Sequence, residues 1–214
     1  ANYLAHSSIS ATYTENDFYI GQNYLENLYV RSKFEAENRV YAAAKRGLNA
    51  TVYRMGNLTS RYSDGKFQPN IADNGFYSAM KSVICMGSVA EGLLSEEIEF
   101  SPVDLSARAI VGILSTKQSN HHVFHVFNPY SLNVSQLAEL FAHIGIDINT
   151  QSPAKPESES LEKVRELLQA NPGIEIYLKE TGELAFPSDI EIRADFTTDY
   201  LHALGFEWPH IEKK

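Results

Sequence analysis

The sequence unit best suited to chemistry is Tyr29-Val30-Arg31-Ser32-Lys33, in which a tyrosine and a lysine are four residues apart. On a helix this spacing places both side chains on one face. The ammonium of Lys33 can then favour the phenolate form of Tyr29, which makes the phenol a stronger acid. Such a tyrosine is suited to protonate a carbonyl oxygen while hydride adds to the carbonyl carbon.

Two further segments strengthen this hypothesis. A Tyr-x-x-x-Lys unit alone is a weak signal, because tyrosine and lysine often share a solvated helix face by chance. Here a serine pair, Ser7-Ser8, precedes the unit at the end of a strand-like segment, and the turn Arg54-Met55-Gly56-Asn57 follows it. A serine, a Tyr-Lys helix and an Arg-x-Gly-Asn turn in this order are improbable as a chance arrangement.

The elements that must position these residues are predicted to alternate between strand and helix. Residues 3–10 are expected to form a buried strand, 12–23 a loop, 24–46 a long helix ended by Gly47, and 49–54 a second strand. A helix between two such strands predicts a parallel α/β arrangement, with functional residues at the carboxyl ends of the strands. The apolar positions expected on the helix are Leu25, Leu28, Phe34, Val40 and Ala44.

The rest of the chain continues the alternation. Residues 56–74 are rich in Gly, Asn, Ser and Asp and are predicted to form a functional loop. Helices are expected at 76–85, 104–114, 134–144 and 196–204, strands at 97–101 and 121–127, and a linker at 152–160 that leads into a helix at 161–170.

Composition limits the class of protein. The 214 residues fit one large or two small domains, and 43% hydrophobic residues are sufficient for a sizeable core. A net charge of -9 argues against a nucleic-acid partner. No apolar run is long enough for a membrane span, so we expect no membrane partner and a cytoplasmic location. The lone Cys85 is compatible with a reducing compartment and is expected to be a small buried hydrophobe.

A histidine group, His121-His122-x-x-His125, raises the question of a metal site. In a strand, His121 and His125 face one side of the sheet and His122 faces the other. Because the three side chains do not converge in this arrangement, we expect no metal site.

Together these motifs resemble the extended short-chain dehydrogenase/reductase superfamily. Within it, the chain resembles the C-terminal part of the thioester reductase domain that ends many nonribosomal peptide synthetases. Residues 103–111 and 124–129 also fit this family, so the resemblance covers roughly residues 1 to 130. The segments that carry it are His6–Ser10, Tyr29–Glu37, Thr51–Thr59, and Gly65–Asn70 with Asn74 and Phe76.

The resemblance implies an α/β fold. It would be the C-terminal part of a Rossmann-like fold with a mostly helical substrate-binding subdomain, and without the N-terminal nucleotide-binding βαβ units. The expected division is a Rossmann-like remnant at 1–68, a substrate-side segment at 69–95, a return to the sheet at 96–130, and a helical C-terminal substrate subdomain at 131–214.

The resemblance also implies roles for the catalytic residues. Tyr29 would be the proton donor, and Lys33 would make its phenol more acidic while holding the nicotinamide ribose. Ser8 would donate a hydrogen bond to the substrate carbonyl, with its neighbour Ser7 as the alternative for this role.

Two further groups would line the site. Met55, Gly56 and Asn57 would lie where the backbone meets the nicotinamide of the cofactor. The loop residues that would face the pantetheine-linked substrate are Phe67, Gln68 and Asn70.

The implied function is part of an NADPH-dependent reductase in nonribosomal peptide biosynthesis. Its partner would be a peptidyl or acyl carrier protein with a phosphopantetheine thioester, which it would release as an aldehyde or an alcohol. One alternative is a fatty acyl-CoA-type or other extended short-chain reductase, although Phe67-Gln68-Pro69-Asn70 argues against the nucleotide-sugar enzymes. Another alternative is a carrier-protein docking module without catalysis.

The sequence contains neither Gly-x-Gly-x-x-Gly nor Gly-x-x-Gly-x-x-Gly. In this fold a glycine-rich loop presents backbone N–H groups and a helix N-terminus to the cofactor pyrophosphate. NADP(H) is therefore expected to bind in the complete domain, with the pyrophosphate-binding loop upstream of Ala1. We accordingly expect this chain to be inactive alone and to be a truncated part of the domain; one part of a split assembly, or a sequence that omits the rest of the domain, are the alternatives.

Overall fold

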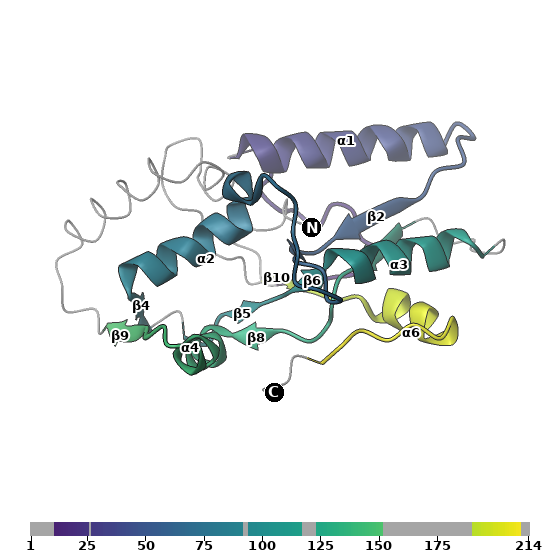
Figure 1. The fold of residues 1–214 in the computed structure, drawn as a ribbon. Helices are drawn as coiled ribbons and strands as arrows, with labels where there is room; N and C mark the ends of the chain where they lie inside the picture. The colour runs from purple at the N-terminus through teal and green to yellow at the C-terminus, as the bar shows by residue number, and fades with distance from the viewer. Residues whose placement is uncertain (1–10, 26, 92–93, 117–122, 152–189, 211–214) are drawn as a thin grey trace. The chain divides into compact units, whose positions relative to one another are not determined.

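The computed structural model describes residues 11–25, 27–91, 94–116, 123–151 and 190–210 (Figure 1). The chain divides into two compact units. Unit 1 comprises Ala1–Lys66, Phe100–Pro129 and Ile176–Pro209, and unit 2 comprises Phe67–Glu99, Tyr130–Glu175 and His210–Lys214. The division predicted at residues 68, 95 and 130 stays a prediction. In the described ranges, no helix combines the length and the hydrophobicity that crossing a membrane requires.

Unit 1 is an α/β arrangement in which the strands pair in parallel (Figure 1). Strand and helix alternate along the chain, as the sequence predicts. The helices of this unit are α1 (Leu28–Ala44), α3 (Val103–Leu114) and α6 (Asp195–Ala203). The strand pairs are β1 (Ala11–Tyr13) with β10 (Ile190–Ile192), β2 (Val52–Met55) with β7 (Val123–Val126), and β3 (Leu58–Thr59) with β6 (Ser101–Pro102).

The described part of unit 2 holds two more helices and two short strand pairs. A 3-10 turn, η2 (Ile71–Asp73), precedes α2 (Gly75–Met86), and the other helix is α4 (Val134–His143). β4 (Ser88–Ala90) pairs in parallel with β9 (Asn149–Gln151), and β5 (Glu97–Ile98) pairs antiparallel with β8 (Leu132–Asn133). The four shorter helices α2, α3, α4 and α6 begin and end within one residue of the predicted bounds.

The long helix α1 begins four residues later than predicted. Asn27 is its N-cap, with an extended backbone and a side chain that accepts a hydrogen bond from the Val30 N–H at 2.9 Å. The predicted apolar positions Leu25 and Leu28 are 56% and 65% exposed, because one precedes the helix and the other opens it. At the far end Gly47 takes a positive φ of 101° after Ala44, which confirms the predicted stop.

Two short strands lie inside segments predicted as loops. β1 includes Thr12 and Tyr13, because they pair with β10 near the other end of the chain. β3 lies within residues 56–74 and pairs with β6. Local composition could not predict either pairing, because each depends on a distant strand. The strand predicted at 3–10 and the helix predicted at 161–170 lie outside the described residues.

Cys85 differs from its prediction, since its side chain is exposed. The buried residues of α2 all lie at or before Ser82, and the helix ends at Met86. The last turn of this helix therefore leaves the thiol outside the core.

The inner face of α1 packs on an aromatic core in unit 1. The buried members of this core are Tyr13, Val30, Phe34 and Ile190. The Phe34 ring stacks on Tyr24 with a centroid distance of 3.9 Å and on Phe18 with a centroid distance of 4.6 Å. These contacts hold the first half of α1, where Tyr29 and Lys33 lie.

Candidate functional site

Tyr29 and Lys33 lie side by side on α1. Tyr29 is the second residue of the helix and is 37% exposed. The Lys33 Nζ lies 5.2 Å from the centre of the Tyr29 ring. This distance is within cation–π range, so the ammonium is held against the face of the tyrosine. The two side chains therefore share one face of the helix, as their spacing predicts.

Met55, Gly56 and Asn57 lie at the carboxyl end of β2. The Gly56 N–H donates to the Val126 carbonyl at 3.4 Å, and the Asn57 carbonyl accepts from the Ser101 N–H at 3.0 Å. The first bond continues the pairing of β2 with β7 past Met55, and the second adjoins the pairing of β3 with β6. All three residues are half-buried. The carboxyl edge of a parallel sheet is where ligands bind in this class of fold.

The remaining predicted site residues belong to other parts of the chain. Ser7 and Ser8 lie outside the described residues. The predicted substrate-side residues belong to unit 2, where the Phe67 ring lies 4.9 Å from that of Tyr77, and Gln68 and Asn70 are exposed. The roles assigned to these residues stay predictions.

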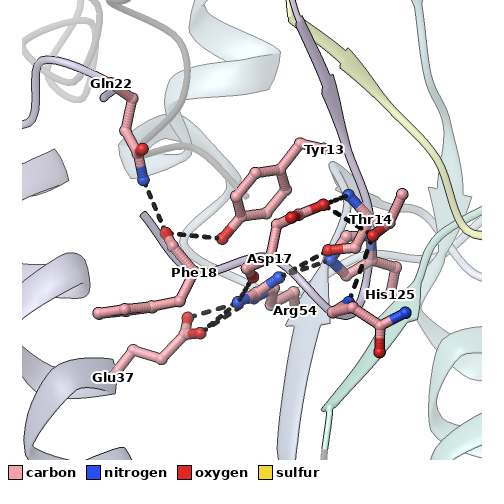
Figure 2. Close-up of polar contacts among 9 residues, drawn as sticks. Tyr13, Thr14, Asp17, Phe18, Gln22, Glu37, Arg54 and His125 are labelled. Atoms are coloured by element: carbon pink, nitrogen blue, oxygen red, sulfur yellow. Dashed lines mark hydrogen bonds and ion pairs between the residues drawn. The ribbon is translucent and has the colours of Figure 1, made fainter. Parts of the chain in front are cut away.

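A buried ion pair connects α1 to β2 and was not predicted from the sequence. The Arg54 Nη2 donates to the Glu37 Oε1 at 2.6 Å, and the Arg54 Nε donates to the same carboxylate at 3.0 Å (Figure 2). Arg54 is 3% exposed and Glu37 is 8% exposed. The available signal was an acidic residue on the helix, one turn after Lys33, followed by an arginine inside an apolar strand.

Further contacts surround the Arg54 guanidinium (Figure 2). Its Nη2 donates to the Asp17 carbonyl at 2.7 Å, and its Nη1 donates to the Thr14 carbonyl at 3.4 Å. The guanidinium carbon lies 4.8 Å from the centre of the Tyr13 ring. Arg54 therefore holds the segment after β1 as well as α1.

His125, in β7, completes this buried polar cluster. The His125 Nδ1 lies 2.6 Å from the Arg193 carbonyl oxygen, which can only accept, so Nδ1 carries the hydrogen. The Nε2 is then free to accept from the Arg54 Nη1 at 2.8 Å. Burial lowers the pKa of His125 to about 4, and the Arg54 charge acts in the same direction, against the hydrogen bond to Arg193.

The neutral imidazole of His125 thus has a structural partner at each nitrogen. Its predicted neighbours in the histidine group, His121 and His122, lie outside the described residues. Among the residues that the structure places, no group of three His, Cys, Asp or Glu side chains could hold a metal ion.

A second buried carboxylate belongs to the same region of unit 1. The Glu15 Oε1 accepts from the Thr197 N–H at 2.9 Å and from the Thr197 hydroxyl at 2.7 Å. The Thr197 Oγ1 in turn accepts from the His125 backbone N–H at 2.9 Å. Glu15 therefore caps the first turn of α6 from a distant part of the chain, where a carboxylate also suits the helix dipole.

Comparison with known proteins finds a family model and several peptide-synthetase polypeptides that are similar to this chain. The model of the family described as "Male sterility protein" (NAD_binding_4) matches residues 6–110. A linear gramicidin synthase polypeptide of Brevibacillus parabrevis is 26% identical over 139 residues, which are 65% of this chain and 3% of that protein. The PKS-NRPS hybrid synthetase acdB of Aspergillus candidus is 29% identical over 127 residues, which are 57% of this chain and 5% of that protein.

Solved structures extend the similarity over nearly the whole chain. A thiolation-reductase di-domain from an archaeal non-ribosomal peptide synthetase is 31% identical with a TM-score of 0.73, covering 94% of this chain and 41% of that one. The reductase domain of the Aureusimine biosynthetic cluster is 26% identical with a TM-score of 0.74, covering 99% of this chain and 53% of that one. The chain thus spans about half or less of these structures, and they confirm the predicted Rossmann-like α/β fold.

Proposed function

We propose that this chain, which is similar to the reductase domains of nonribosomal peptide synthetases, carries the proton-donating part of an NADPH-dependent thioester reductase of the extended short-chain dehydrogenase/reductase superfamily. Its substrate is a peptidyl or acyl thioester on the phosphopantetheine of a carrier protein, and its product is an aldehyde or an alcohol. The observation that carries this proposal is the contact between Lys33 and Tyr29 on α1.

The described residues fit a nicotinamide cofactor. Lys33 offers a cation for the ribose hydroxyls, and Met55, Gly56 and Asn57 offer backbone groups at the carboxyl edge of the sheet. When bound, NADPH supplies the hydride. The 214 residues contain no glycine-rich loop for the pyrophosphate, so we expect them to bind NADPH weakly when isolated.

The side chains of this chain act on the carbonyl oxygen. The Tyr29 hydroxyl and the Ser8 hydroxyl donate hydrogen bonds to the thioester oxygen, and they stabilise the negative charge that forms there as hydride adds to the carbon. The C=O bond then re-forms while the C–S bond breaks, and the pantetheine sulfur leaves and takes up a proton. One thioester, one hydride and one proton give one aldehyde and one thiol.

An alcohol requires a second cycle at the same site. A second hydride adds to the aldehyde carbon, and the Tyr29 hydroxyl transfers its proton to the oxygen. The hydroxyl of Tyr29 is therefore needed in both reductions.

The decisive substitution is Tyr29→Phe, which removes the hydroxyl and keeps the ring. We expect kcat to fall by about 10²- to 10⁴-fold, the usual contribution of a positioned general acid. The measurement is NADPH oxidation with an acyl carrier-protein thioester, in a protein that holds a glycine-rich loop ahead of these residues. Tyr19→Phe is the matched control, because Tyr19 is 59% exposed and lies in the loop before α1.

Each alternative has its own outcome in this assay. Full activity of Tyr29→Phe would show that its assigned role is wrong. Equal turnover of the matching acyl-CoA would favour an acyl-CoA reductase, and binding of the carrier protein without turnover would favour a docking module. The ratio of kcat/KM for NADPH and NADH decides the cofactor.

A further inference from the structure

The geometry of unit 1 points to a positioning role for the buried Glu37–Arg54 ion pair, and this inference rests on the proposed function. We propose that the pair sets the orientation of the helix face that carries Tyr29 and Lys33 relative to the turn Met55-Gly56-Asn57. Neither Glu37 nor Arg54 is proposed to touch the substrate or the cofactor.

The two members of the pair adjoin the two halves of the proposed site. Tyr29, Lys33 and Glu37 are spaced by four residues, so they lie on successive turns of α1. Arg54 immediately precedes Met55 in β2. The ion pair therefore links the proton-donor helix to the cofactor-side strand, and it does so within one helical turn of Lys33.

The contact between Glu37 and Arg54 also restrains the orientation of α1 about its axis. The planar guanidinium of Arg54 presents Nε and Nη2 to one carboxylate, with distances of 3.0 Å and 2.6 Å to the Glu37 Oε1. Such a fork restrains rotation as well as distance. The Asp17 carbonyl and the His125 Nε2 hold the guanidinium from other sides. Rotation of α1 about its axis would break this contact.

Stability alone is a weak explanation for this pair. Both side chains are almost fully desolvated, and in buried pairs the cost of desolvation can offset the Coulombic gain. Apolar residues of similar volume stabilise many folds equally well. Apolar replacements would not keep the fixed geometry that the fork gives, and catalysis is sensitive to displacements of about 1 Å.

The test compares two glutamates on the same helix. Glu37→Gln keeps the size of the side chain and removes its charge, and we expect kcat to fall about 10- to 100-fold with KM for the thioester nearly unchanged. Glu35→Gln is the control, because the side chain of Glu35 is 53% exposed and pairs with Arg31 at 3.4 Å on the surface. We expect Glu35→Gln to keep the activity of the unsubstituted domain.

A double substitution separates positioning from a general loss of structure. If Glu37 acts through the tyrosine, Glu37→Gln costs less than about threefold in a Tyr29→Phe background, because the hydroxyl that it positions is already absent. If the double variant loses as much kcat as the product of the two single losses, the positioning role is overturned. If Tyr29→Phe alone has no effect, the proposed function fails instead, so the two failures differ.

Arg54→Lys keeps the positive charge and removes the planar fork of the guanidinium. It is the second test of the positioning role if Glu37→Gln does not fold. We expect it to lower kcat about 10-fold or more while thermal unfolding still shows a folded domain. Full activity of folded Arg54→Lys would overturn the proposal.

Discussion

At the scale of single residues, Arg54 is the most connected side chain of the site region. It joins a helix carboxylate, two loop carbonyls and a histidine nitrogen (Figure 2). Because Arg54 is always charged and donates to these partners, its guanidinium favours the neutral state of His125. A proton on the Nε2 of His125 would face the guanidinium and remove an acceptor from it.

The neutral state of His125 predicts how stability varies with pH. The pKa of His125 falls from its ordinary 6.5 to about 4 in the folded protein, mainly through burial. Between these values the unfolded chain binds a proton that the folded chain does not, so stability is full above about pH 6.5 and decreases as the pH falls toward 4. The loss attributable to His125 is on the order of 3 kcal/mol.

The measurement is denaturant unfolding at pH 7 and pH 5, with and without His125→Gln. Gln keeps an acceptor for Arg54 and does not titrate, so the difference between the two pH values should shrink. The control His143→Gln removes an exposed histidine and should leave the difference intact. If His125→Gln shows the same difference in the free energy of unfolding between pH 7 and pH 5, His125 is not the cause of the pH dependence.

At the scale of elements, α1 shows how a cap overrides an apolar pattern. The apolar residues Leu25 and Leu28 suggest an earlier start, yet the helix begins where the side chain of Asn27 can accept the Val30 N–H. The buried residues of α1 are Val30, Phe34 and Glu37. The Asn27 cap therefore fixes the helix before Tyr29 and Lys33, and the ion pair of Glu37 fixes it after them.

Asn27→Ala tests the importance of this cap. The substitution leaves a helix N–H without its acceptor, and we expect a loss of about 1 kcal/mol in the free energy of unfolding. Asn27→Asp is the matched control, because aspartate is an equally good capping residue and should retain most of the stability. Chemical unfolding of the two variants measures the difference, and equal losses in both would argue against capping as the cause.

At the scale of the whole molecule, unit 1 is assembled from three separate stretches of the chain. β1 pairs with β10, and Glu15 caps α6 through Thr197, a contact between residues 182 positions apart. Thr197 also accepts from the backbone of His125 in β7. The C-terminal helix of this unit is thereby part of the same buried network as the site.

Thr197→Val is the corresponding test. The substitution is nearly isosteric and removes the hydroxyl, so the backbone N–H of His125 loses its acceptor and Glu15 loses one of its donors. We expect the free energy of unfolding to fall by about 1 to 3 kcal/mol. Thr198→Val is the control at the next position of α6, with a half-buried side chain, and should cost less. The same loss at both positions would assign the effect to helix propensity.

Features that depend on near neighbours in the chain could be predicted from the amino-acid order. The spacing of Tyr29 and Lys33 placed them together on a helix, and periodicity predicted the bounds of the four shorter helices to within one residue. The parallel α/β class followed from the alternation of elements. These features are local, because helix periodicity, caps and glycine stops act over a few residues.

The tertiary structure decided which polar residues are buried together. Glu37 and Arg54 are 17 residues apart, Arg54 and His125 are 71 apart, and each alone is an ordinary charged or polar residue in the sequence. The exposure of Cys85 and the pairing of β1 likewise depend on distant packing. The Tyr29–Lys33 pair could be predicted because one helix brings its members together, whereas the Arg54 cluster required the whole of unit 1 to fold.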